Sequence, residues 1–97
     1  MDRMARTVVT RRFVVQGRVQ GVGFRAFVKN VAEAFDIDGW VRNDQSGDVE
    51  ILVQGTEENL RSFTEQIEIG PASSRVDRLH VQEVENGAGF RGFTVIR

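Results

Sequence analysis

The part of the sequence best suited to chemistry is a glycine-rich segment, GRVQGVGFR, at residues 17–25. Its three glycines allow tight curvature and leave backbone N–H groups uncovered. The segment lies between a predicted strand and a predicted helix, whose N-terminus directs further N–H groups and a positive dipole end to the same place. Arg25 begins that helix. The pattern predicts a cradle for a tetrahedral oxyanion such as phosphate, formed by consecutive amides and one guanidinium.

A plain glycine turn, with a solvated Arg25, is the alternative interpretation of this segment. The helix dipole slightly disfavours a cation in the first turn, which favours an anion beside Arg25. Two nucleotide motifs are excluded. The run GVGFRA at residues 21–26 fits G-x-G-x-x-G/A, but a dinucleotide fold needs a larger parallel sheet than 97 residues permit. No G-K-[ST] follows the glycines, which excludes a P-loop.

Asn43 is the second candidate, because it ends a short predicted strand at residues 40–43. This strand is expected to run parallel to the strand that precedes the glycines, either directly beside it or with one strand between. The carboxyl ends of both strands then share one edge of the sheet. A neutral amide both donates and accepts hydrogen bonds, so Asn43 could fix a water beside a bound phosphate. The alternative is a turn asparagine that bonds its own backbone.

The chemical repertoire of the chain is otherwise narrow, with one histidine, no cysteine and no tyrosine. The lack of cysteine excludes a disulfide framework, a thiolate nucleophile and a cysteine-based metal site. His80 alone cannot form a multi-histidine metal site and is expected at the surface. No apolar run approaches the roughly 20 residues that span a bilayer, and residues 1–6 lack an apolar signal core. These features predict a cytoplasmic protein.

The elements that must position these residues follow from hydrophobic periodicity. The predicted strands cover residues 12–19, 40–43, 49–54, 76–84 and 92–96, and the predicted helices cover residues 24–35 and 57–69. Thr56 is the predicted N-cap of the second helix, and Trp40 is expected in the core. The order β-α-β-β-α-β, plus one C-terminal strand, predicts an α+β ferredoxin-like two-layer sandwich. Its sheet is antiparallel or mixed, with both helices on one face.

The chain is predicted to form one domain at residues 11–97, preceded by a flexible N-terminal lead-in at residues 1–10. No linker, repeat or low-complexity stretch divides it. Residues 1–31 carry seven basic residues and one acidic residue, whereas residues 32–97 carry six basic and 13 acidic residues. The basic first third predicts either an anionic partner or a solvated terminus.

The sequence resembles the acylphosphatase family. Residues 17–25 match the loop signature of that family, and Gly39-Trp40-Val41-Arg42-Asn43, followed by Gly47 and Val49-Glu50, resembles its second signature. Gly70-Pro71 followed by Val76, and Gly92-Phe93, resemble later landmarks. The likeness covers residues 11–97. It departs from the common pattern at Ala26, where many relatives have an aromatic residue, and at Ser46, where an aspartate is common.

The resemblance implies hydrolysis of the carboxyl–phosphate bond of acyl phosphates, which yields carboxylate and phosphate. It implies that Arg25 and the backbone amides of Gln20, Gly21, Val22, Gly23 and Phe24 bind the phosphoryl group, and that Asn43 orients the attacking water. No metal and no cofactor are implied. The expected partners are the small-molecule acyl phosphate and its phosphate product, for a monomer that binds neither nucleic acid nor membrane.

Two other functions remain open from the sequence. An acylphosphatase-like domain also begins the large carbamoyltransferases of hydrogenase maturation, which would make this chain a binding or accessory module. Those proteins continue into cysteine-rich zinc motifs, and this sequence contains no cysteine. The run RGFTV at residues 91–95 resembles an RNA-binding RNP1 stretch, although it lacks the second aromatic residue. An RNA-binding ferredoxin-like domain is therefore the remaining alternative.

Overall fold

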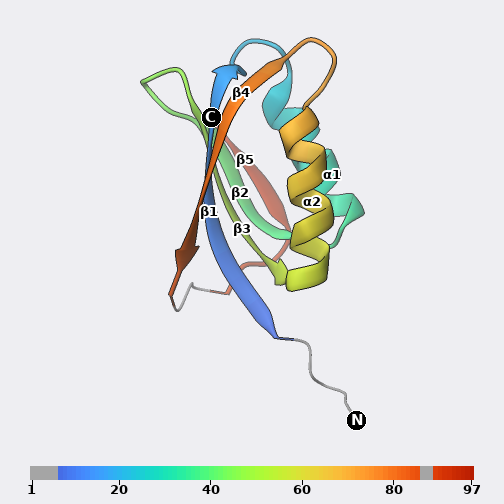
Figure 1. Ribbon diagram of the computed structural model, residues 1–97. Coiled ribbons are helices and arrows are strands. Elements are labelled where there is room, and N and C mark those ends of the chain that lie inside the picture. The colour runs from blue at the N-terminus through green and yellow to red at the C-terminus, as the bar shows by residue number, and fades with distance from the viewer. Residues whose placement is uncertain (1–6, 86–88) are drawn as a thin grey trace.

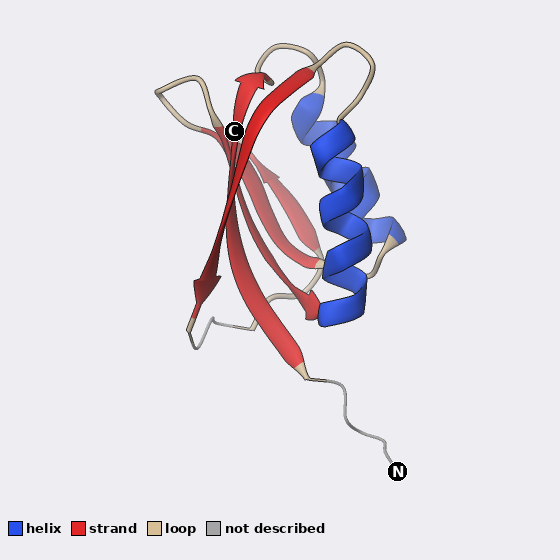
Figure 2. Cartoon of the chain, viewed as in Figure 1, coloured by secondary structure: helices blue, strands red, loops and turns tan. Residues whose placement is uncertain are grey.

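The computed structural model describes residues 7–85 and 89–97 (Figure 1). Two helices cover one face of a five-stranded sheet, and Figure 2 shows the opposite face of the sheet free of helices. The elements are β1 (Val8–Arg18), α1 (Phe24–Ala34), β2 (Asp38–Asn43), β3 (Val49–Thr56), α2 (Glu57–Ile69), β4 (Arg75–Val84) and β5 (Phe93–Ile96). The predicted ferredoxin-like order with one extra C-terminal strand is confirmed.

The strand order β4-β1-β3-β2-β5 brings the two candidate segments to one edge of the sheet. β3 is antiparallel to both β1 and β2, so these two strands are parallel to each other with one strand between them. β2 and β5 pair in parallel, which makes the sheet mixed. The loop that follows β1 and the residue that ends β2 therefore lie at the same edge.

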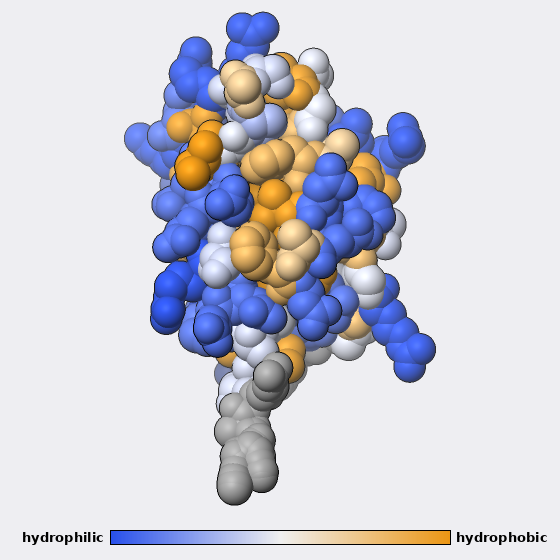
Figure 3. All heavy atoms as spheres, turned by 90° about the vertical axis from the view of Figure 1, so that its right-hand side faces the viewer, coloured by the Kyte–Doolittle hydropathy of each residue, from blue (hydrophilic) through white to orange (hydrophobic). Residues whose placement is uncertain are grey.

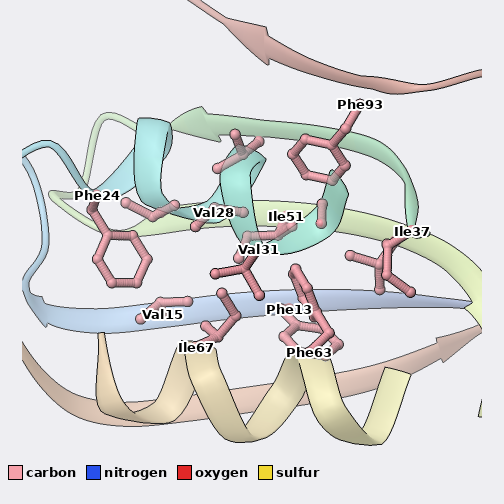
Figure 4. Packing of buried hydrophobic residues seen from close by; sticks show 14 of the residues in the cluster. Phe13, Val15, Phe24, Val28, Val31, Ile37, Ile51, Phe63, Ile67 and Phe93 are labelled. Atoms are coloured by element: carbon pink, nitrogen blue, oxygen red, sulfur yellow. The ribbon is translucent and has the colours of Figure 1, made fainter. Parts of the chain in front are cut away.

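The core lies between the sheet and the helix layer (Figure 4). β1 and β3 alternate, so that Phe13 and Ile51 face the helices and are fully buried. From α2, Phe63 packs edge-on against Phe13 with ring centroids 5.6 Å apart. Phe24 and Val28 bury one side of α1 against the same core. Because the first turn of α1 is anchored in this core, the loop before it has a rigid support.

The capping of α2 follows the prediction. The Thr56 hydroxyl oxygen accepts a hydrogen bond from the Asn59 N–H at 3.2 Å. Glu57 and Glu58 occupy the first turn, where the helix dipole favours acidic side chains. The helix ends at Gly70, whose φ is 70°.

The structure differs from the sequence predictions at several places. β2 begins at Asp38 rather than at Trp40, and β3 ends at Thr56 rather than at Gln54. β1 begins at Val8, four residues before the predicted start and within the expected lead-in. Residues 8–11 pair with β3, and residues 10 and 11 also pair with the end of β4. Trp40 is not in the core. It is half-buried on the helix-free face, with the Arg42 guanidinium 5.5 Å from its ring centroid, because Val41 takes the inward position of this short strand.

The expected exposure of His80 is confirmed, whereas two predicted segments lie in part outside the described residues. His80 is exposed, and its Nε2 lies 3.2 Å from the Gln16 side-chain oxygen. Residues 1–6 of the expected lead-in, and residues 86–88 of the expected loop, lie outside the described residues.

The outer surface of the helix layer is mainly polar. Figure 3 shows hydrophilic side chains on both sides of a central strip of hydrophobic ones. Within residues 7–85 and 89–97, neither helix is long and apolar enough to cross a membrane.

Candidate active site

The segment between β1 and α1, residues 19–24, is called the phosphate loop below. It contains no regular secondary structure before Phe24, the first residue of α1. Gly21 and Gly23 have φ values of 74° and 77°, in the left-handed region, and Gly23 is the N-cap of α1. A Cβ at either glycine would meet no atom within 4 Å. These two glycines are therefore required by backbone conformation rather than by space.

The backbone N–H groups of the phosphate loop are free to bind a ligand. In the described part of the chain, no N–H of residues 20–24 donates a hydrogen bond to another group. The Ser73 hydroxyl donates to the Val22 carbonyl at 2.9 Å and so fixes the direction of this peptide. Because a trans peptide points its C=O and N–H in opposite directions, the Gly23 N–H points away from Ser73.

Arg25 is in the first turn of α1, half-buried beside the loop. Its Nη1 donates to the Ile96 carbonyl oxygen at 3.0 Å, so the end of β5 orients the guanidinium. It forms no ion pair with any residue that the structure describes. The guanidinium is thus held in place by an uncharged partner and keeps its full positive charge.

Asn43 ends β2 opposite Val49 of β3. Its side-chain oxygen Oδ1 is buried and has no hydrogen-bond partner in the described part of the chain. A turn asparagine would bond its own backbone through this oxygen, and Asn43 does not. A buried amide oxygen without a partner is costly, which indicates an acceptor held ready for a donor from outside the chain.

One pocket of about 280 Å³ brings these groups together. It is lined by Val19, Gly21, Gly23, Phe24, Arg25, Ala26, Lys29, Asn43, Val95 and Arg97. Of the residues predicted for the site, Gln20 and Val22 do not line the pocket. Its lining includes three cations and no acidic residue. This combination suits a small anion of high charge.

Lys29, Val95 and Arg97 are pocket residues that sequence reasoning missed. Lys29 lies one helical turn after Arg25. Residues at this spacing share a helix face, so the sequence could have predicted that Lys29 lies beside Arg25. Its Nζ lies 2.9 Å from Glu33 and donates to the Phe93 carbonyl at 3.4 Å. Arg97 has no ion pair or hydrogen bond within the residues that the structure describes. No local pattern indicates that β5 reaches the pocket.

The turn at residues 44–48, called the hairpin loop below, follows Asn43 directly. The Asp44 carboxylate accepts hydrogen bonds from the Ser46 hydroxyl, from the Ser46 N–H at 2.8 Å and from the Asp48 N–H at 3.3 Å. The Ser46 hydroxyl is the main cause that lowers the pKa of Asp44, and the two backbone N–H groups add to it. Asp44 is thus a charged residue that shapes the turn.

The side chain of Gln20 joins the phosphate loop to the hairpin loop. Its Nε2 donates to the Asp44 carbonyl at 2.9 Å and to the Asp48 carbonyl at 2.8 Å. Sequence reasoning assigned only the backbone amide of Gln20 to the site. Within the described residues, no three His, Asp or Glu side chains are grouped to hold a metal ion.

Comparison with known proteins gives one consistent result. The family model for acylphosphatase matches residues 11–95. The chain is 40% identical to the acylphosphatase of Koribacter versatilis, over 95% of this chain and 84% of that protein. It is 44% identical to the acylphosphatase of Bacillus licheniformis, over 87% of this chain and 93% of that protein.

Solved structures agree with the sequence relatives. The crystal structure of acylphosphatase from Bacillus subtilis is similar with a TM-score of 0.89 and 40% identity, over 94% of this chain and 100% of that chain. Full-length HypF, in a phosphate- and nucleotide-bound form, is similar with a TM-score of 0.89 and 34% identity. This chain covers only 12% of HypF.

Proposed function

Because the chain belongs to the acylphosphatase family, and is an enzyme that hydrolyses acyl phosphates, we propose that the pocket between the phosphate loop and Asn43 is its active site. One observation carries this proposal. A single pocket joins free loop amides, an unneutralised Arg25 and an amide oxygen of Asn43 that lacks a partner. These are donors for a phosphoryl group and an acceptor for a water molecule.

In the proposed reaction, the N–H groups of residues 20–24 and the Arg25 guanidinium hold the phosphoryl oxygens. Negative charge on these oxygens changes as the leaving group departs, and donors already in place stabilise it without reorganising. The pocket holds such donors on the loop and helix side. This arrangement lowers the barrier mainly by positioning and electrostatics, as phosphoryl transfer requires.

Asn43 orients the nucleophile in this mechanism. Its Oδ1 accepts a hydrogen bond from the attacking water, and the water oxygen forms a bond to phosphorus. The bond between phosphorus and the acyl oxygen breaks, and the electron pair leaves with the carboxylate. A phosphoryl oxygen of the substrate takes the proton from the water. No strong general base is needed, because a carboxylate is a good leaving group.

The finer partner assignments belong to the same proposal. We infer that the enzyme acts as a cytoplasmic monomer without metal or cofactor, and without binding nucleic acid. The absence of cysteine fits a reducing compartment. Light scattering measures the molar mass in solution and so tests the monomer. Adding EDTA tests the metal-free mechanism, which a loss of turnover would contradict.

The decisive test measures hydrolysis of benzoyl phosphate alongside hydrolysis of p-nitrophenyl phosphate. The first substrate releases a carboxylate, whereas the second releases a poorer phenolate leaving group. We expect rapid turnover of benzoyl phosphate and little turnover of the monoester. Equal rates on both substrates, or no turnover of benzoyl phosphate, would contradict the proposed mechanism.

A further inference from the structure

We propose that the side chain of Gln20 is a positioning residue that sets the place of Asn43 relative to the bound phosphoryl group. This inference rests on the proposed function, because it assigns Asn43 to the water. It concerns the Gln20 side-chain amide, which is distinct from the backbone N–H that Gln20 contributes to the cradle.

The geometry is that of a two-point clamp. The Nε2 of Gln20 donates to the carbonyls of Asp44 and Asp48 at 2.9 and 2.8 Å. These two residues form the base of the hairpin loop, where the Asp44 N–H also donates to the Asp48 carbonyl at 2.9 Å. Both hydrogens of one amide are therefore used on the two ends of the same turn.

Asn43 immediately precedes this base. A shift of Asp44 moves the Asn43 backbone directly, and the buried Oδ1 of Asn43 has no partner of its own to hold it. The Asp44 carboxylate fixes the inside of the turn through Ser46 and Asp48, so the turn moves as one unit. The placement of Oδ1 thus depends on what holds the base of the turn.

The sheet alone does not supply this link. β3 lies between β1 and β2, so the Asn43 end of the hairpin loop is about two strand spacings, or roughly 10 Å, from β1, whereas the β3 end of this loop is next to β1. Within the described residues, the Gln20 side chain makes the only hydrogen bonds that directly join residues 19–25 to residues 43–48. Cutting this link leaves the strand pairing and the weaker contact from Gln16 Nε2 to the Asp48 carboxylate at 3.4 Å intact, but it removes the direct tie between the phosphate loop and the Asn43 end of the hairpin loop.

The clamp needs a donor, since both partners are carbonyl oxygens. A carboxylate at position 20 cannot donate and repels them, whereas a protonated carboxyl donates one hydrogen bond. Gln20→Glu therefore converts the clamp into a pH-dependent one. The carboxylates of Asp44 and Asp48, the two residues whose carbonyls the clamp holds, are charged groups that bear on the introduced carboxyl.

The experiment measures kcat and KM for benzoyl phosphate, and the inhibition constant for inorganic phosphate, in Gln20→Ala. The control is Gln45→Ala, which removes an exposed glutamine of the same hairpin loop that makes no hydrogen bond in the described residues. We expect Gln20→Ala to lower kcat by about 10-fold to 100-fold, because small misplacements of reacting groups carry such costs. Phosphate inhibition should change by less than about threefold, and Gln45→Ala should match the wild type.

Two further variants separate positioning from a general loss of structure. The ratio of kcat in Gln20→Glu to kcat in the wild type should rise as pH falls below about 5, while the same ratio for Gln20→Ala stays flat. In an Asn43→Ala background, adding Gln20→Ala should lower kcat by less than about twofold, since Gln20 acts through Asn43.

A wild-type kcat in Gln20→Ala, or equal losses from Gln20→Ala with and without Asn43, would overturn the inference. A fall in phosphate affinity that matches the fall in kcat would also overturn it, because the side chain would then serve the cradle. If Asn43→Ala itself retains full kcat, the proposed function fails first, and this result is distinguishable from failure of the clamp alone.

Discussion

Arg25 is oriented by the Ile96 carbonyl rather than by a carboxylate. A carboxylate partner would neutralise the guanidinium and compete with the substrate phosphoryl group. A carbonyl fixes the geometry and leaves the charge for the ligand. By contrast, Arg11 is held by two acids, Glu57 and Glu83, and these contacts raise its pKa. The two arginines thus have different surroundings: Arg25 has an uncharged partner and Arg11 has two acidic ones.

Arg25→Ala should abolish phosphate binding and lower kcat/KM by on the order of 100-fold or more, because the main cation of the cradle is lost. Phosphate binding is measured by calorimetry, and turnover is measured with benzoyl phosphate. Arg91→Ala, which removes an exposed arginine outside the pocket, is the control. Comparable activity in both variants would remove Arg25 from the mechanism.

Asn43→Ala should lower kcat by about 100-fold while KM changes by less than about threefold, because the water loses its partner and the phosphoryl group does not. Steady-state kinetics on benzoyl phosphate checks this split. Asn30→Ala, on the exposed side of α1, should leave both constants unchanged. A large rise in KM with unchanged kcat would show that Asn43 binds substrate instead.

At the scale of elements, an irregularity at the end of β1 directs the chain into the phosphate loop. The register between β1 and β4 shifts between Gln16 and Gly17. Gly17 has a φ of 137°, and a Cβ there would lie 2.1 Å from the Arg75 carbonyl oxygen. Only glycine allows this close approach, so the strand ends and turns where the site needs it.

Gly17→Ala should destabilise the protein by at least about 2 kcal/mol, because alanine is strained at this positive φ and its Cβ would collide with the Arg75 carbonyl oxygen. Urea unfolding followed by circular dichroism measures the loss. Gly89→Ala introduces a Cβ that meets nothing within 4 Å and is the control. Equal stability of the two variants would show that the strand end relaxes at little cost.

Thr56→Ala should cost about 1 kcal/mol, because the Asn59 N–H at the start of α2 loses its acceptor. Thr56→Ser keeps a hydroxyl and should restore most of the stability, as measured by urea unfolding. The kinetic constants should not change in either variant, since α2 contributes no residue to the pocket. Equal losses in Thr56→Ala and Thr56→Ser would assign the cost to the lost methyl group.

Most of the elements could be predicted because their apolar residues repeat at a regular local spacing. Residues 24–35 repeat apolar side chains at helical spacing, and α1 follows them. The strand at Trp40 is too short for its pattern to outweigh the usual burial of tryptophan, and its face was mistaken. The link from Arg25 to Ile96 spans 71 positions, and no local rule predicts such a contact.

The candidate site also contains some residues that the sequence predicts and others that it does not. The glycines, Arg25 and Asn43 were predicted because helix geometry and parallel strand ends bring them together. The roles of Lys29, Arg97 and the Gln20 side chain depend on how β5 and the hairpin loop dock. Those contacts belong to the tertiary structure alone.

For the whole molecule, some cations of the basic first third are paired with acids in the part of the fold that the structure describes. Arg11 pairs with Glu57 and Glu83, and Arg12 shares Glu50 with Arg42 on the helix-free face. Lys29 pairs with Glu33 and also lines the pocket, which Arg25 lines without an ion pair among the described residues. Of the cations in the first third, only Arg25 and Lys29 therefore line the pocket that would bind the anionic partner predicted from the charge asymmetry.

Stability should fall in acid partly through Glu50. Burial would raise the pKa of this nearly covered carboxyl, but hydrogen bonds from Arg12 and Arg42 outweigh burial and lower the pKa. A folded-state pKa below the unfolded value gives stability that is present at neutral pH and is lost as pH falls through the lowered pKa. The unfolding free energies of wild type and Glu50→Gln should therefore differ at pH 7, and this difference should shrink as the pH falls below the unfolded-state pKa of the carboxyl.

Urea unfolding at several pH values checks this decrease. Glu58→Gln, on the exposed first turn of α2, is the control and should show a smaller difference from wild type. A gap between wild type and Glu50→Gln that stays constant down to pH 3 would show that Glu50 does not titrate with folding.

The contact between Arg25 and β5 joins a residue that is synthesised early to a strand that is synthesised late. The ribosome delivers residues 1–92 before the strand that orients Arg25 and borders the pocket exists. The pocket is therefore complete only after β5 has been made and has paired with β2.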